Sequence, residues 1–256
     1  MLVPGLAWRI GPLSLHVQRV AGEWQLSHHE EGRESALADW AVQAIDPAST
    51  DPEALARFAL KTDGDTVRLT PRPADRSVVA TPRAQLHVLA GEDARIYVSA
   101  PVWVEISAGQ PPRTLCEIPT RRLTDTWFGR STREGEVAYA LKTQAHARLE
   151  NVNTAAYRAV TPVRIHNRGT DPLRLDRMNL PVPYLSIYHD ENGSLWTETV
   201  TLVRGTDEEM ATFQITPGPP GEAREAHRVG EPRQTATGHP LVRAFGRFLR
   251  PFQEED

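Results

Sequence analysis

The stretch TDTWFGRSTREG, residues 124–135, contains residues whose types and spacing could bind a ligand or catalyse a reaction. It places Trp127 and Phe128 beside a glycine, and Arg130 and Arg133 follow closely. Guanidinium groups near an aromatic ring can bind an anion, because they donate hydrogen bonds in a fixed fork and stack on ring faces. A small-ligand or anion-binding site, or the active site of a hydrolase, could therefore be built around Trp127, Arg130 and Arg133.

The same stretch also fits a structural role. The segment EVAYALKT that follows it alternates, so Val137, Tyr139 and Leu141 would share one face of a half-buried strand. Two large rings ahead of that strand can each bury about 150–250 Å². We therefore expect Trp127 and Phe128 to fill one end of a β-domain and anchor the strand. Acidic residues among the arginines indicate a mixed, solvated rim, and we favour this interpretation over ligand binding.

Histidines and carboxylates form two further short clusters. SHHEE offers metal-ligand types, but neighbouring residues of a strand face opposite sides, so His28 and His29 would not converge. In YHDENGSLW the Asn-Gly dipeptide signals a tight turn, which explains His189 and Asp190 without any chemistry. No nucleophile elbow, glycine-rich phosphate loop or HExxH motif occurs. The sequence therefore predicts no catalytic residues, no metal site and no cofactor.

The composition is that of a soluble globular protein. With 256 residues, 39% of them hydrophobic, the chain can bury one large core or two modest ones. A formal net charge of −4 argues against nucleic-acid binding, which needs a basic surface. The single cysteine, Cys116, excludes an internal disulfide and a cysteine-built zinc site. No signal peptide or membrane-spanning stretch is visible, so we expect a cytoplasmic protein.

A hydrophobic period of two dominates the chain. The runs LSLHVQRV and EWQLSHH indicate a hairpin, and later runs rich in β-branched and aromatic residues are separated by turn clusters such as PRPADRS and DENGS. Short strands at this spacing predict an all-β domain over residues 8–215, built as an antiparallel β-sandwich. Residues 51–60 differ, because Asp51 suits an N-cap and Leu55 and Phe58 would share a helix face. One short helix is predicted there.

The composition changes after the β-domain. Residues 216–240 are dense in Pro, Gly and charge, which predicts a flexible linker. Residues 241–252 then show the period of an amphipathic helix, with an apolar stripe opposite arginines. These side chains are Leu241, Phe245, Phe248 and Leu249 on one side and Arg243 and Arg247 on the other.

Three docking modes are open to such a helix. It could pack back on its own β-domain and cover a sheet edge. It could enter a groove of a partner protein, as tethered helices commonly do. It could also lie on an anionic membrane, although one short helix with three arginines binds a membrane weakly.

Several sequence blocks resemble a known prokaryotic family. They are RLTPRPADRSVVATPRAQLHVLAGEDARIYVSAPVWVEI, TDTWFG and PVRIHNRGTDPLRLDRMNLPVPYLSIYHDENGSLWTETV. In order and spacing they resemble domain of unknown function 432 (DUF432), over about residues 10–215. The resemblance implies no activity, catalytic residue or cofactor. Members of the family are often said to be encoded beside mechanosensitive channels of the small-conductance type, which implies such a channel as a candidate partner.

Together these patterns predict a non-enzymatic β-sandwich module that binds or regulates a protein partner through its C-terminal helix. A mechanosensitive channel is the candidate partner, and contact with the inner membrane would place the protein at its periphery. The alternative is the small-ligand protein or hydrolase with its site at Trp127, Arg130 and Arg133. The sequence does not indicate an oligomeric state.

Overall fold

The structure is a computed structural model, and it describes residues 5–30, 40–45, 56–61, 63–129, 131, 133, 135–205, 211–235 and 242–244. Over these residues the chain is all-β, as predicted, and its only helical segments are short 3₁₀ turns. Among them no helix has the length and apolar character that a membrane span needs. The chain divides into two compact units, and the predicted domain of residues 8–215 includes parts of both.

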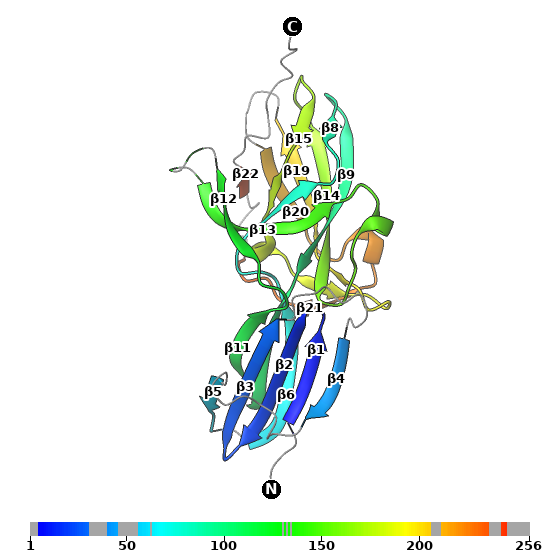
Figure 1. Cartoon of the computed structure of the whole chain (residues 1–256). Coiled ribbons are helices and arrows are strands. Elements are labelled where there is room, and N and C mark those ends of the chain that lie inside the picture. The colour runs from blue at the N-terminus through cyan, green and yellow to red at the C-terminus, as the bar shows by residue number, and fades with distance from the viewer. Residues whose placement is uncertain are drawn as a thin grey trace. The chain divides into compact units, whose positions relative to one another are not determined.

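Unit 1 comprises Met1–Arg72, Pro101–Arg122 and Ala155–Tyr157, and it contains two antiparallel sheets. The first has the strand order β4-β1-β2-β3-β5 (Figure 1). Its strands are β1 (Gly5–Ile10), β2 (Leu13–Val20), β3 (Glu23–Glu30), β4 (Trp40–Ile45) and β5 (Ala56–Ala59). The second has the order β11-β10-β6, with β6 (Asp63–Arg72), β10 (Trp103–Gln110) and β11 (Arg113–Pro119).

Both sheets of unit 1 contribute to one hydrophobic core. The predicted hairpin is confirmed as the antiparallel pair β2–β3, in which Val17 lies opposite Leu26. Leu13, Leu15 and Val17 each expose 2% or less of their surface, because alternate residues of β2 face the core. Ile106 of the second sheet is completely buried in the same cluster. Burial of each such side chain contributes about 1.5–3 kcal/mol.

The helix predicted at residues 51–60 is wrong where the structure describes it. Ala56–Ala59 form strand β5, which pairs antiparallel with β3. Phe58 packs against the core of unit 1 from this strand. A helix this short is marginal unless tertiary packing supports it, and here the packing supports a strand. The first five residues of the predicted helix lie outside the described residues.

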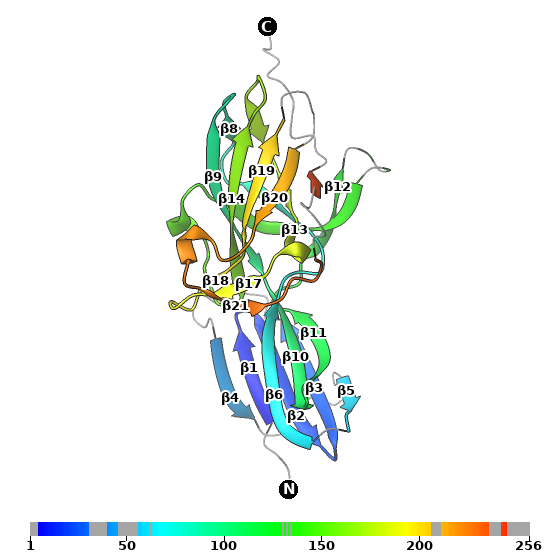
Figure 2. The ribbon, with the colours of Figure 1, turned by 180° about the vertical axis from the view of Figure 1, so that it is seen from behind.

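Unit 2 comprises Pro73–Ala100, Leu123–Thr154 and Arg158–Asp256. A four-stranded sheet has the order β12-β13-β7-β16, with β7 (Val78–Pro82), β12 (Thr124–Gly129), β13 (Gly135–Ala145) and β16 (Met178–Leu180). The largest sheet has the order β21-β17-β18-β14-β19-β20-β22, with β9 beside β14 (Figures 1 and 2). Its strands are β9 (Asp93–Pro101), β14 (Arg158–Asn167), β17 (Ile187–His189), β18 (Leu195–Trp196), β19 (Thr199–Arg204), β20 (Ala211–Thr216), β21 (His227–Gly230) and β22 (Val242–Ala244).

The remaining elements of unit 2 are short. Strands β8 (Leu86–Val88) and β15 (Leu173–Leu175) form a separate antiparallel pair. The 3₁₀ turns are η3 (Leu149–Asn151), η4 (Val182–Tyr184) and η5 (Gly221–Ala223). Most strand pairs are antiparallel, as predicted, but β13–β7, β14–β18 and β14–β19 are parallel. Parallel neighbours need long connections, and here other strands of the unit lie within those connections.

The predicted flexible linker, residues 216–240, differs from the structure over its described part. Ala223 and Ala226 expose 7% and 9% of their surface and lie in a hydrophobic cluster with Tyr97. Strand β21 pairs antiparallel with β17. Small alanines and backbone hydrogen bonds hold this segment on unit 2. Composition alone does not reveal this, because the segment itself contributes only alanines to the cluster.

The predicted helix at residues 241–252 is described only at Val242–Ala244. These three residues form strand β22, which pairs antiparallel with β20, and Arg243 lies on it. The structure therefore has a strand where the first turn of the helix was expected. The other predicted partner-binding residues lie outside the described part of the chain, namely Leu241, Phe245, Arg247, Phe248 and Leu249.

Candidate functional site

The two adjacent aromatic residues of β12 have opposite environments. Phe128 exposes 1% of its surface, and the Arg177 guanidinium lies over its ring, 5.2 Å from the ring centroid. Trp127 exposes 41% of its surface. Consecutive strand residues face opposite sides of a sheet, so only one of the two can face the interior. The anchoring interpretation is therefore confirmed for Phe128 and wrong for Trp127.

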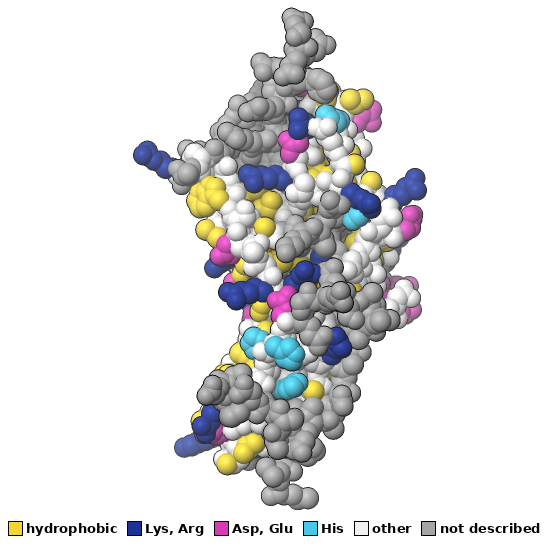
Figure 3. All heavy atoms as spheres, in the orientation of Figure 1, with side chains coloured by type: hydrophobic (Ala, Val, Ile, Leu, Met, Phe, Trp, Pro, Cys, Tyr) yellow, Lys and Arg dark blue, Asp and Glu magenta, His cyan; other side chains and the backbone are white. Residues whose placement is uncertain are grey.

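The exposed Trp127 is held in place by its own hairpin. Its indole Nε1–H donates a hydrogen bond to the Ser131 carbonyl oxygen at 2.8 Å. A Cβ added to Gly135 would lie 2.8 Å from Trp127 Cε2, so the ring lies directly against this glycine. Val137, 48% exposed, is the cross-strand partner of Trp127. We call Trp127 and Val137 the hairpin patch, and hydrophobic side chains are visible over β12 in Figure 3.

A polar network lies beside the hairpin patch. Tyr139 occupies the same face of β13 as Val137, and its hydroxyl donates to Asp75 at 2.9 Å. Burial, together with the Asp75 hydrogen bond, raises the pKa of Tyr139 to about 12, so the hydroxyl stays protonated near neutral pH. Arg76 lies over the Tyr139 ring at 5.4 Å and pairs with Asp125 at 3.0 Å. The patch therefore has a fixed polar border on one side.

Comparison with known families gives one clear match. The family model described as "Protein of unknown function (DUF432)" matches residues 3–250, nearly the whole chain. The chain belongs to the DUF432 family. Comparison with curated proteins and with solved structures gives no match. The description of this family states no activity.

Arg130 and Arg133 were predicted to form a ligand site together with Trp127, and the structure of this DUF432 protein describes only one of these two arginines. Arg130 lies outside the described residues. Arg133 is exposed, and its backbone N–H donates to the Ser131 hydroxyl at 3.2 Å. The structure thus brings Trp127 and Arg133 into one hairpin. Neither residue lines the cavity of unit 2 at the ends of β7 and β13.

His28 and His29 lie on opposite faces of β3 in unit 1, as predicted. His16 and His29 share the outer face of β2 and β3, with ring centroids 6.2 Å apart, whereas the alternation of β3 places His28 on the other face. Burial, and then the nearby His29, lower the pKa of both His16 and His28. Histidine side chains are visible on the surface of this unit in Figure 3. Within the described ranges no group of three or more His, Cys, Asp or Glu residues could hold a metal ion.

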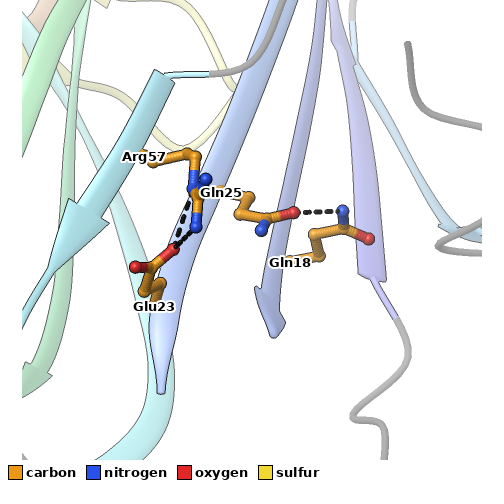
Figure 4. A network of polar contacts seen from close by, with 4 residues as sticks. All are labelled: Gln18, Glu23, Gln25 and Arg57. Atoms are coloured by element: carbon orange, nitrogen blue, oxygen red, sulfur yellow. Dashed lines mark hydrogen bonds and ion pairs between the residues drawn. The ribbon is translucent and has the colours of Figure 1, made fainter. Parts of the chain in front are cut away.

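The same outer face carries polar side chains that bind one another. Gln18 Nε2 donates to Gln25 Oε1 at 3.0 Å across β2 and β3 (Figure 4). The Arg57 Nε and Nη2 atoms both donate to Glu23 Oε2, at 2.8 and 2.6 Å (Figure 4). These contacts join β2 to β3 and β3 to β5. They stabilise the pairing of these strands in the sheet.

The turn interpretation of His189 and Asp190 is supported by the contacts of Asp190. Its Oδ1 accepts the backbone N–H groups of Asn192 and Ser194, at 3.0 and 2.8 Å. Its Oδ2 accepts the indole N–H of Trp196 at 2.8 Å. Both carboxylate oxygens thus have donors, from the turn and from β18, and Asp190 stabilises the local fold.

The single cysteine is a poor nucleophile in this fold. Burial, and then the adjacent Glu117 carboxylate, raise the pKa of Cys116 to about 11. Only the thiolate reacts with alkylating reagents. At pH 7.5 we expect iodoacetamide to modify the native protein about two orders of magnitude more slowly than a free cysteine, whose pKa is about 8.5.

Mass spectrometry across a pH series tests this expectation. The rate should keep rising towards pH 11, and the urea-unfolded protein should instead show the ordinary profile of a free thiol. A native rate that levels off near pH 8.5 would contradict the prediction.

Proposed function

We propose that this DUF432 protein is a non-enzymatic module that binds a partner protein through the hairpin patch. The observation that carries the proposal is the fixed exposure of Trp127, 41% of whose surface is accessible beside the 48% exposed Val137. Tryptophan is enriched among the residues that dominate binding energy at protein interfaces. In this proposal the two sheets of unit 1 pack on a shared core as a β-sandwich, and the patch itself lies on unit 2.

The surroundings of the patch fit the anatomy of an interface. Interfaces have an apolar centre and a polar rim, and here Tyr139, Arg76 and Asp125 supply such a rim. The Arg76–Asp125 pair is exposed, so it contributes little to stability. The hydrogen bond from Trp127 to Ser131 already restricts the indole ring before a partner arrives. Such preorganisation lowers the entropy cost of binding.

The position of β12 in its sheet suggests how the partner binds. Among the described strands β12 is outermost in the order β12-β13-β7-β16. An edge strand presents backbone N–H and C=O groups to which an extended segment can add as a further strand. We therefore propose that the occupant is an extended segment with apolar side chains, which covers Trp127 and Val137 while pairing with β12.

The family supplies a candidate for the partner. DUF432 members are often said to be encoded beside mechanosensitive channels of the small-conductance type, so such a channel is the partner we propose to test first. Binding to a channel would place the protein at the periphery of the inner membrane. Residues 245–252, which follow strand β22, would then be a second contact with the channel or with its lipid.

The experiment measures binding of the purified protein to an immobilised, detergent-solubilised small-conductance channel. We expect Trp127→Ala to weaken binding at least thirtyfold, since truncation of a dominant interface residue costs about 2 kcal/mol or more. Leu89→Ala is the matched control, because Leu89 is 60% exposed on another part of unit 2. It should bind as the unaltered chain does.

Melting temperatures of both variants establish that the fold is intact. Two results count against the proposal: an unaltered chain that does not bind the channel, or a Trp127→Ala variant that binds it with unchanged affinity. A deletion of residues 245–256, which leaves strand β22 in place, then shows whether the C-terminal segment adds affinity of its own.

A further inference from the structure

A cavity of about 420 Å³ lies within unit 2, at the ends of the parallel strands β7 and β13. Residues 82–86, which lead from β7 into β8, form one wall. Residues 145–148 and Asn151, which follow β13, form the other. Ile96 of β9, 2% exposed, and Ala145, 3% exposed, give the cavity an apolar lining. The volume falls within the range of about 300–1,000 Å³ that is typical of small-molecule sites.

Backbone hydrogen bonds fix the two walls relative to each other. The Arg83 N–H donates to the Ala145 carbonyl oxygen at 3.0 Å. His146 and Tyr97 exchange two backbone hydrogen bonds, of 2.8 and 3.0 Å, which tie the second wall to β9. Arg148 lies two residues further along, where η3 begins. The backbone at both arginines is therefore held in place, and both side chains are exposed.

The charged side chains that line the cavity are all positive. Arg83 and Arg148 both line it, and no aspartate or glutamate does. Within the part of the chain that the structure describes, neither arginine forms an ion pair. Arg95 and Arg174, which do not line the cavity, lie 2.9 and 2.8 Å from the carboxylates of Glu222 and Asp176. Two guanidinium groups without carboxylates at one apolar hollow favour an anionic ligand.

We propose that this cavity binds a phosphate monoester that carries an apolar group. The two guanidinium groups match the two negative charges of the phosphate, and each can donate two hydrogen bonds to it. A bare phosphate would leave much of the cavity empty, so the rest of the ligand lies against Ile96 and Ala145. His146 and Asn151 offer further polar contacts. This site is separate from the hairpin patch and does not depend on partner binding.

Calorimetric titration of the full chain with phenyl phosphate and with inorganic phosphate tests the proposal. We expect phenyl phosphate to bind more tightly, because only it covers the apolar lining. Arg83→Gln and Arg148→Gln should each weaken phenyl phosphate binding about tenfold, the effect of losing a charge-assisted hydrogen bond, and the double variant should abolish it. Arg164→Gln is the matched control, because Arg164 is exposed on β14 and does not line the cavity.

A second variant places a negative charge in the cavity itself. Ala84 is exposed and lines the cavity, so Ala84→Glu should fold normally and repel the ligand. Phenylacetate, which carries a single charge, should bind more weakly than phenyl phosphate. The proposal is overturned if phenyl phosphate does not bind, or if Arg83→Gln and Arg148→Gln leave its affinity unchanged. Equal affinity for phenyl phosphate and inorganic phosphate would overturn the assignment of the apolar lining.

Discussion

Replacing Gly11 by alanine is expected to destabilise unit 1 by about 2–5 kcal/mol. Gly11 lies between β1 and β2 with a φ of +57°, a backbone conformation that disfavours any residue with a Cβ. An added Cβ would also lie 2.2 Å from Cδ1 of Tyr157, which is buried in the core of the same unit. The backbone strain amounts to about 1–2 kcal/mol, and overpacking adds about 1–3 kcal/mol.

The variant Gly22→Ala separates the backbone strain from the overpacking against Tyr157. Gly22 lies between β2 and β3 with a φ of +84°, but no heavy atom lies within 4 Å of the Cβ position. This control should therefore lose only the backbone contribution of about 1–2 kcal/mol. Urea unfolding followed by tryptophan fluorescence measures both variants. If Gly11→Ala is no less stable than Gly22→Ala, the contact with Tyr157 does not constrain the fold.

The strands of this chain are predictable because burial on one face imposes a period of two. Leu13, Leu15 and Val17 are all buried and alternate with polar residues, so the β2–β3 hairpin follows from the sequence. Pairing between distant strands does not follow, because nothing in β7 or β13 marks the other as its parallel neighbour. The prediction of a helix at residues 51–60 was wrong for a related reason. Its local signals were weak, and contact with β3 determines its conformation.

The candidate site was predictable only in part. The alternation that separates His28 from His29 also separates Trp127 from Phe128, so the two rings cannot both anchor the same face. Which ring faces the interior depends on what packs against β12. That packing cannot be predicted from the local sequence pattern. The structure places Phe128 against Arg177 and leaves Trp127 accessible.

The cavity of unit 2 had no sequence signal at all. Arg83 and Arg148 are far apart in the chain, and each stands in an ordinary polar segment. They line one cavity because β7 and β13 run parallel and end together, with Ala145 opposite Pro82 in the register. Sites assembled by such pairing become visible only when the register is known.

Replacing Phe128 by alanine is expected to destabilise unit 2 by about 3–5 kcal/mol, as truncation of a buried phenylalanine usually does. The side chain is 1% exposed, so its removal leaves a cavity. The contact with the Arg177 guanidinium is lost as well, and such cation–π contacts contribute about 0.5–1 kcal/mol or more. Phe128→Leu should retain most of the stability, because it keeps most of the buried volume.

Trp127→Ala is the matched comparison, one residue away on the same strand. Its side chain is 41% exposed, so we expect a loss of about 1 kcal/mol or less, mainly from the hydrogen bond to Ser131. Urea unfolding of both variants under identical conditions gives the order of the two effects. The expected order assigns folding to Phe128 and leaves Trp127 available for a partner. If Trp127→Ala destabilises unit 2 more than Phe128→Ala does, Trp127 is the structural anchor. The hairpin patch would then not be a binding surface.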